Sequence, residues 1–132
     1  MERGGYYSVD SLSGVYALVV AHVRDTQVML RAVLEYCGAL VATADTAEAA
    51  LASMKQVKPD VLVVSLDLPP DDAHRLLRAV RALKPEEGGT VPMVALSEGA
   101  LEPRGPRFSV YLSQPFDPWE LCRTISTLVL VG

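Results

Sequence analysis

Three residues, His22, Ser65 and Ser97, have side chains that could carry out nucleophilic chemistry together, with histidine as the base and serine as the nucleophile. Each lies within a short apolar run or one to two residues after it, where a strand would end. A serine–histidine hydrolase also needs a third group that orients the base, an oxyanion hole and a serine on a sharp turn such as G-x-S-x-G. Ser65 stands in the run VVSLD, which contains no glycine. We therefore do not expect an enzyme, and we expect hydrogen bonds among these side chains or with water.

Cys37 and Cys122 are the two cysteines of the chain. Neither has a second cysteine or a histidine at the spacing of a zinc site, so we expect free thiols and no bound metal. No glycine-rich phosphate loop follows the first apolar run (AHVRDT), so we expect no nucleotide or flavin cofactor. Cys37 would end the first helix and Cys122 would begin the last. We expect them at opposite ends of the sheet, too far apart for a disulfide.

The elements that would position these residues alternate along the chain. Short apolar runs predict strands buried on both faces, at 15–20, 39–44, 61–66, 91–96 and 108–112. Amphipathic stretches predict helices at about 25–36, 45–57 and 71–83, and a last helix after Asp117. This alternation predicts an α/β fold, a flavodoxin-like doubly wound parallel sheet of five strands in the order 2-1-3-4-5. Sites in such sheets lie beyond the carboxyl ends of the strands.

The predicted helices begin and end at recognisable residues. Asp45, with Glu48 three residues later, forms a capping box at the start of the second helix. Asp71 or Asp72 can cap the third helix, and Asp117 is followed by a first-turn proline. Gly38 stands where a left-handed cap would end the first helix.

Composition limits the class of protein. The 132 residues are 50% hydrophobic with a net charge of -4, which suits one globular domain. We expect an N-terminal extension, 1–14, followed by one folded domain, 15–132. No apolar run approaches the ~20 residues of a membrane span, and 1–14 does not resemble a signal peptide, so we expect a cytoplasmic protein.

The charge pattern disfavours nucleic acid as a direct partner. The chain has no basic block, and its net charge is negative. Basic residues do recur at spacing three along the predicted third helix, at Arg75, Arg78, Arg81 and Lys84. We interpret this stripe as the solvated face of the helix.

Four phrases carry a resemblance to a known family: LRAVLEYCGALVATADTAEAAL, VLVVSLDLPP, VPMVALS and YLSQPFDPWEL. Over residues 15–129 the chain resembles the receiver domain of bacterial response regulators, the CheY-like family. The resemblance implies two-component signalling, in which a histidine kinase or phosphorelay donates a phosphoryl group to an aspartate ending the third strand. It also implies an acidic pair after the first strand that holds Mg²⁺, a Ser or Thr after the fourth, and a lysine before a proline.

Most of the family's site is replaced in this chain. The acidic pair falls on Ala21 and His22, the phosphoacceptor on Ser65 and the lysine on Gln114. Alanine and serine supply no anionic oxygen for Mg²⁺, and neutral histidine is a poor ligand for it. A glutamine carries no charge to stabilise phosphoryl oxygens. The resemblance therefore implies a degenerate receiver, or pseudo-receiver.

Two features of the family's site remain. Ser97 keeps the hydroxyl after the fourth strand, and Tyr111 occupies the aromatic position that acts as a switch in the family. Asp67, two residues after Ser65, can be interpreted as a displaced phosphoacceptor. Because metal ligands are lacking, we favour a solvated loop carboxylate that starts the turn into the following prolines.

Residues 98–107 (EGALEPRGPR) contain two prolines and two glycines, which forbid a long regular helix. The family's fourth helix is therefore expected to be shortened or missing. The resemblance implies that this helix, the fifth strand and the last helix together form the output and dimerisation face. Either its shortening exposes an apolar patch, or the loop folds down with Leu101 and Phe108 as a lid. The candidate interface residues are Leu101, Phe108, Tyr111 and Trp119.

These observations predict a receiver-like signalling module that acts by protein–protein interaction and is not phosphorylated. Its partner would be a signalling kinase, an effector domain or a second copy of itself, as a homodimer. Two alternatives remain open. The chain could be an atypical receiver that is still phosphorylated at Asp67 or Ser65, or it could bind a small ligand at the vacant rim pocket.

Overall fold

A computed structural model of the chain describes residues 11–97, 108–113 and 116–131. Within these residues, five parallel strands form one sheet in the order β2-β1-β3-β4-β5. The strands are β1 (Tyr16–Val20), β2 (Leu40–Ala44), β3 (Val61–Ser65), β4 (Met93–Ser97) and β5 (Val110–Ser113). The helices are α1 (Arg24–Tyr36), α2 (Ala47–Gln56), α3 (Pro70–Arg81) and α4 (Pro118–Val131), with a 3-10 turn at Pro85–Glu87. The predicted fold class and strand order are confirmed.

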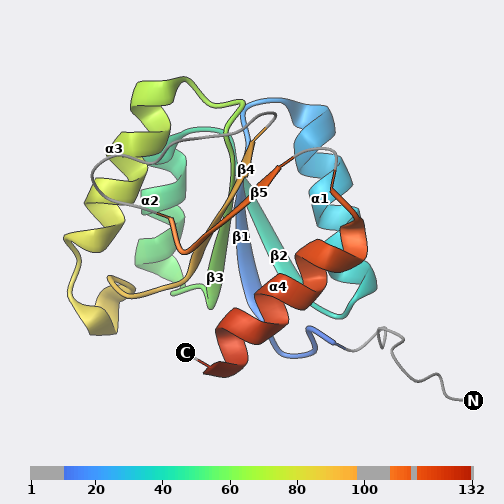
Figure 1. Cartoon of the computed structure of the whole chain (residues 1–132). Helices are drawn as coiled ribbons and strands as arrows, with labels where there is room; N and C mark the ends of the chain where they lie inside the picture. The colour runs from blue at the N-terminus through green and yellow to red at the C-terminus, as the bar shows by residue number, and fades with distance from the viewer. Residues whose placement is uncertain (1–10, 98–107, 114–115, 132) are drawn as a thin grey trace, which may run out of the picture.

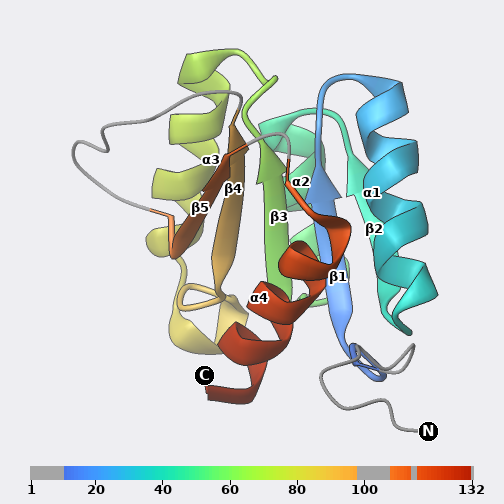
Figure 2. The ribbon, with the colours of Figure 1, turned by 45° about the vertical axis from the view of Figure 1, so that its right-hand side comes forward.

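Helices cover both faces of the sheet (Figure 1). Among the described helices, α2 and α3 lie on one face and α1 and α4 on the other, as the turned view also shows (Figure 2). Successive side chains of a strand point to opposite faces, so Leu62 belongs to the core under α2 and α3 and Val63 to the core under α1 and α4. All five residues of β3 are buried. The predicted continuous apolar run is therefore a central strand, buried on both sides.

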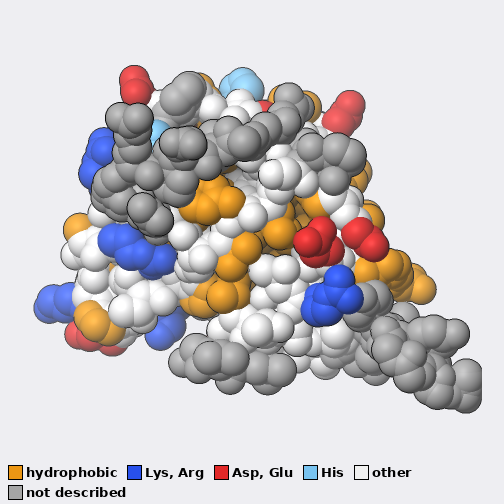
Figure 3. All heavy atoms as spheres, viewed as in Figure 1, with side chains coloured by type: hydrophobic (Ala, Val, Ile, Leu, Met, Phe, Trp, Pro, Cys, Tyr) orange, Lys and Arg blue, Asp and Glu red, His pale blue; other side chains and the backbone are white. Residues whose placement is uncertain are grey.

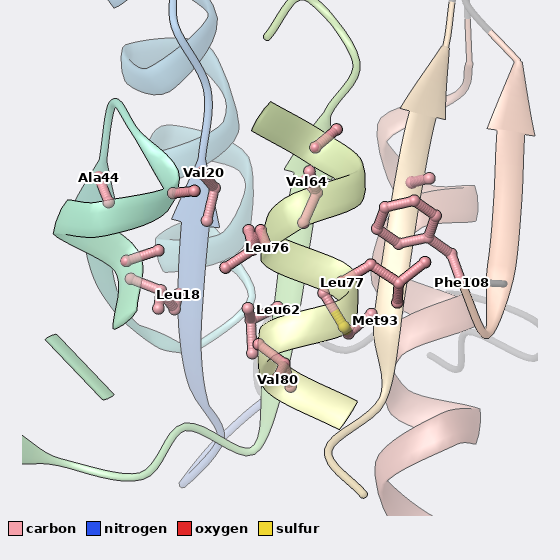
Figure 4. Close-up of a cluster of buried hydrophobic side chains, with 14 of the residues drawn as sticks. Leu18, Val20, Ala44, Leu62, Val64, Leu76, Leu77, Val80, Met93 and Phe108 are labelled. Atoms are coloured by element: carbon pink, nitrogen blue, oxygen red, sulfur yellow. The ribbon is translucent and has the colours of Figure 1, made fainter. Parts of the chain in front are cut away.

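The core under α2 and α3 extends to the start of the fifth strand. Leu77 of α3 points toward Met93 of β4 and the ring of Phe108 (Figure 4). Leu77 is 1% exposed and Met93 is fully buried. The helical period of 71–83 therefore gave the correct inward face of α3.

Two of the predicted helix caps are wrong. Thr46, not Asp45, caps α2: its hydroxyl accepts a hydrogen bond from the backbone N–H of Ala49 at 3.0 Å. The N-cap residue of α3 is Pro69, which makes no side-chain cap. Asp72 instead contacts the start of α2. Local sequence pattern finds the region of a helix start, but the rest of the fold decides which acceptor meets which N–H.

The loop between α3 and β4 is held by Arg81, which is not on the solvated face that the spacing predicted. Its guanidinium donates to the carbonyl oxygens of Gly89 at 3.1 Å and Val91 at 2.7 Å. Burial lowers the pKa of Arg81. At Gly89, an added Cβ would lie 2.0 Å from the carbonyl oxygen of Leu83, so this close approach requires glycine.

At the end of α1, the predicted glycine cap is confirmed, whereas the predicted separation of the two cysteines is wrong. Gly38 has a φ of 99°, the left-handed value expected of the residue that ends this helix. Cys37 and Cys122 are free cysteines, and both are buried. The prediction that they lie at opposite ends of the sheet is wrong, because Cys122 lies against the last turns of α1, with its Sγ 4.0 Å from the carbonyl oxygen of Val33, and its thiol interacts with that of Cys37. The reason is the oblique course of α4 across the sheet, which brings its first turns to the last turn of α1 (Figure 1).

Several predictions fall outside the described residues. Residues 98–107, where the family's fourth helix is expected to be shortened or missing, are among them, and so are Leu101 and Gln114. Of the predicted extension, 1–14, the structure describes residues 11–14. There Leu12 is fully buried, and its N–H donates to the carbonyl of Cys37 at 2.8 Å. None of the described helices is long and apolar enough to cross a membrane.

Candidate functional site

The loops that follow β1, β3 and β4 meet at one edge of the sheet, because the strands are parallel. Ala21 directly follows β1 and is fully buried. Ser65 and Ser97 are the last residues of β3 and β4, and they are 3% and 6% exposed. In the strand register Ser65 pairs with Leu96, so the two serines lie on neighbouring strands, displaced by one residue. We call this edge the rim.

Asp67 joins the loop after β3 to the loop after β1. Its Oδ1 accepts a hydrogen bond from the backbone N–H of His22 at 3.0 Å, and its Oδ2 accepts one from Val23 at 3.2 Å. Val23 is the N-cap residue of α1, and its own side chain makes no capping bond. The carboxylate therefore satisfies amides at the start of α1, where the helix dipole favours negative charge. Sequence reasoning missed this role of Asp67.

Asp72 makes the corresponding connection to α2. Its Oδ2 accepts a hydrogen bond from the backbone N–H of Ala47 at 3.1 Å, and its Oδ1 accepts one from the guanidinium of Arg75. The backbone hydrogen bond from Ala47 is the main cause that holds the pKa of Asp72 below its ordinary value. Arg75 and, more weakly, the charge of His22 lower the pKa further, against the opposing effect of burial. Two aspartates after β3 thus hold the starts of α1 and α2.

The backbone of Ala21 is hydrogen-bonded on both sides. Its N–H donates to the carbonyl of Ala44 at 3.0 Å, and its carbonyl accepts from Nε2 of Gln27 at 2.7 Å. Gln27 lies on the first turn of α1, so its amide ties the helix back to the end of β1. No motif in the sequence singled out Gln27, because the signal is only its position six residues after Ala21.

His22 is exposed, and its backbone N–H donates to the carboxylate of Asp67. Across residues 11–97, 108–113 and 116–131, no group of three or more His, Cys, Asp or Glu side chains is arranged to hold a metal ion. The rim therefore presents a methyl group, two hydroxyls, an imidazole and a carboxylate that is already hydrogen-bonded.

The candidate interface residues lie on two faces. Phe108 is 6% exposed and packs edge-on against the ring of Tyr111, with centroids 5.6 Å apart. The hydroxyl of Tyr111 accepts a hydrogen bond from the backbone N–H of Phe108 at 3.3 Å. Both belong to the core region under α2 and α3. Trp119 packs with the core under α1 and α4, where its ring lies 5.7 Å from that of Tyr36.

The parallel sheet of order 2-1-3-4-5, with loops converging on one rim, is a doubly wound, flavodoxin-like fold, which receiver domains share. The chain is similar to the receiver domain of the sensor histidine kinase PA1611 from Pseudomonas aeruginosa PAO1, with 27% identity and a TM-score of 0.77. That match covers 89% of this chain and 98% of the other. A putative response regulator from Chloroflexus aurantiacus gives 27% identity and a TM-score of 0.77, over 88% of this chain and 98% of the other. The chain belongs to the response-regulator receiver (CheY-like) family.

The chain also has a curated relative of similar length. The chain is 34% identical over 127 residues to an uncharacterized 14.6 kDa protein in the sodA1 3′ region of Leptolyngbya boryana. The match covers 92% of this chain and 95% of that protein. The chain matches no model of a protein family. Receiver domains are modules of two-component signalling that work with protein partners such as kinases or effectors and are generally not enzymes.

Proposed function

We propose that this chain is a pseudo-receiver, which regulates through protein–protein contact without being phosphorylated. The observation that carries the proposal is the double hydrogen bond of Asp67 to the backbone N–H groups of His22 and Val23. In the family, the loops after β1 and β3 hold a divalent cation between them. Here a carboxylate from one loop bonds directly to the backbone of the other. A cation in that place would have to compete with two amides for the same oxygens.

The side chains at the rim do not fit magnesium. The receiver domain of PA1611 has a magnesium ion coordinated in its active site cleft. Mg²⁺ requires near-octahedral oxygen ligation, with one or two carboxylates from the protein. In this chain the positions of the family's acidic pair carry the buried methyl group of Ala21 and the imidazole of His22. The side chains at these positions thus argue against a metal-assisted phosphoryl transfer.

Ser65 is a poor phosphoacceptor in these surroundings. A serine hydroxyl needs a neighbouring general base before it can act as a nucleophile. His22 would be the candidate base, but it is an exposed residue in the loop after β1. Ser65 itself is 3% exposed. Phosphorylation of Asp67 would bond the phosphoryl group to one of the two carboxylate oxygens that accept hydrogen bonds from the start of α1, so these contacts oppose that alternative.

The switch position also favours a receiver that does not switch. In the family, this aromatic residue changes position in response to phosphorylation. Here the hydroxyl of Tyr111 is bonded to the backbone of Phe108, and the two rings pack edge-on. Both contacts would have to break before Tyr111 could move. We infer that the module presents one fixed surface to its partners.

The surface around β5 and α4 is the proposed contact region. In the space-filling view, hydrophobic side chains show at the centre of this face, with acidic and basic side chains beside them over α4 (Figure 3). Half-buried hydrophobic residues of this region are Val110, Phe116, Trp119, Leu128 and Val129. A contiguous apolar surface usually marks an interface. The proposed partners are a signalling kinase, an effector domain or a second copy of the chain in the cytoplasm, without direct binding of nucleic acid or membrane.

The competing proposal of a small ligand at the rim has less support. Two cavities, of about 580 and 250 Å³, are lined by residues near the opposite edge of the sheet. The larger lies between α2 and the segment after α3, with Met54 and Leu83 in its lining. The smaller borders Asp60 and Pro92, which precede β3 and β4. Neither includes Ser65, Ser97 or His22.

Incubation with acetyl phosphate and Mg²⁺, followed by intact-mass measurement, tests the proposal. We expect no gain of a phosphoryl group in the wild-type chain, whereas a receiver domain with the full acidic set, treated in parallel, gains one. The variant Ala21→Asp/His22→Asp/Ser65→Asp/Gln114→Lys restores the family's residues and is the matched comparison. A phosphoryl gain in the wild-type chain that is lost in Asp67→Asn or Ser65→Ala would establish the atypical receiver instead.

A further inference from the structure

Cys37 and Cys122 meet at the contact between α1 and α4. Cys37 directly follows α1, and Cys122 lies in the second turn of α4. The Sγ atom of Cys122 is 4.0 Å from the carbonyl oxygen of Val33, one turn before Cys37. On the same seam, the rings of Tyr36 and Trp119 lie 5.7 Å apart. Two independent contacts therefore bring the end of α1 against the beginning of α4.

The two thiols are neighbours within this seam and are shielded from solvent. Cys37 is fully buried and Cys122 is 1% exposed, and both belong to the core under α1 and α4. Burial is the main cause that raises the pKa of the Cys122 thiol, and the hydrogen bond and charge of Cys37 raise it further. The raised pKa keeps the Cys122 thiol protonated, and burial makes both thiols slow to react while the seam is closed. A reaction between them therefore requires a local separation of α4 from α1.

We propose that Cys37 and Cys122 form a reversible intramolecular disulfide, which joins the end of α1 to α4 when the protein meets hydrogen peroxide. One cysteine, as its thiolate, attacks an oxygen of the peroxide. The O–O bond breaks, a sulfenic acid forms, and the hydroxide that leaves takes up a proton to become water. The second cysteine then attacks this sulfur as a thiolate, the S–S bond forms, and a second water leaves. The two sulfurs together lose two electrons, and the peroxide is reduced to two waters.

The disulfide would fix the position of α4, which forms part of the proposed contact surface. It closes a loop of about 85 residues, which in the chain-entropy account restricts the unfolded chain strongly. For a domain of this size we expect the midpoint of thermal unfolding to rise by about 10 °C. This inference goes beyond the proposed function and does not depend on it, since the thiols lie away from the rim.

The test uses the full chain, reduced and then treated with hydrogen peroxide. After treatment, the protein is unfolded in the presence of an alkylating reagent, and its intact mass is measured. We expect a monomer that has lost two hydrogen atoms, takes up no alkyl group and regains two reactive thiols with dithiothreitol. The oxidised monomer should also melt about 10 °C above the reduced one.

Two single variants serve as matched controls. Cys37→Ala and Cys122→Ala each retain one thiol, so neither can lose two hydrogen atoms within a monomer, and far-UV circular dichroism checks that each is folded. The wild-type chain decides the outcome even if a variant unfolds. Two alkylated thiols after oxidation, oxygen-added masses alone, or disulfides only between chains would overturn the proposal. A phosphoryl gain in the acetyl phosphate experiment would contradict the pseudo-receiver proposal but not the disulfide proposal.

Discussion

The carboxylate of Asp67 accepts a hydrogen bond from the backbone N–H of His22 at 3.0 Å, and so connects the loop after β3 to the loop after β1. The same carboxylate accepts a second bond, from the N-cap residue Val23. A negative group thus lies at the start of α1, where the unpaired amides and the helix dipole stabilise it. We infer that the rim retains a negative charge between these loops and uses it to hold α1.

Replacement of Asp67 by alanine should destabilise the domain by about 1 kcal/mol, because two amides at the start of α1 lose their acceptor. Urea denaturation followed by far-UV circular dichroism measures the change. Asp71→Ala is the matched control, since Asp71 is an exposed aspartate of the same segment. An equal loss in both variants would show that general charge, and not the bond to α1, is responsible.

Asp72 should make stability depend on pH in the acid range. Its pKa is lowered in the folded state from an ordinary value of 3.8. The stabilisation is therefore complete above that value and is lost as pH falls through the lowered pKa. The free energy of unfolding of the wild-type chain should exceed that of Asp72→Asn at pH 7, and the difference should shrink below about pH 4. A difference that stays constant from pH 7 to 2 would contradict this assignment.

Leu77→Ala should cost about 2–5 kcal/mol of unfolding free energy, because the lost methyl groups leave a cavity beside Met93 and Phe108. Leu40→Ala removes the same atoms from a side chain that is 66% exposed, and should change stability by less than about 0.5 kcal/mol. Thermal or urea unfolding of the two variants gives the comparison. Similar losses in both would mean that the inward face of α3 is assigned incorrectly.

Gly89→Ala should destabilise the domain by about 3 kcal/mol or more, which is large for a single added methyl group. The new Cβ would lie 2.0 Å from the carbonyl oxygen of Leu83, and this obstacle is backbone that cannot rotate away. The carbonyl of Gly89 is also held by Arg81, which opposes a shift of the loop. Thr90→Ala, at the neighbouring exposed residue, should have little effect on the melting temperature. A Gly89→Ala protein as stable as Thr90→Ala would disprove the close approach.

Ser65→Ala should leave the free energy of unfolding within about 0.5 kcal/mol of the wild type and leave partner binding unchanged, because the proposed pseudo-receiver does not use this hydroxyl as a phosphoacceptor. Ser65→Asp should cost about 2 kcal/mol or more, since it places a carboxylate at a position that is 3% exposed. Denaturation at pH 7 separates the two variants. Loss of partner binding in Ser65→Ala would point to a role for the hydroxyl.

The predicted strands agree with the observed ones to within one or two residues at each end. Val61–Ser65 is an example, because its continuous apolar run requires burial on both faces. Alternation implied a parallel sheet, since parallel neighbours need crossover helices, and the strand order came from the fit of five strands to a doubly wound, flavodoxin-like fold. That reasoning also located the rim, where Ala21, Ser65 and Ser97 come together.

The sequence by itself therefore determined the fold class, the order of the strands and the chemical groups available at the rim. Tertiary structure alone decided that Asp67 bonds to the start of α1, that Asp72 bonds to the start of α2, and that Cys37 lies against Cys122. Hydrophobic period is a local property of the chain and can be read from neighbouring residues. These three contacts join residues that are far apart in sequence, and they depend on the inclination of helices and the course of loops. The inclination of the helices and the course of the loops are set only when all the elements pack together.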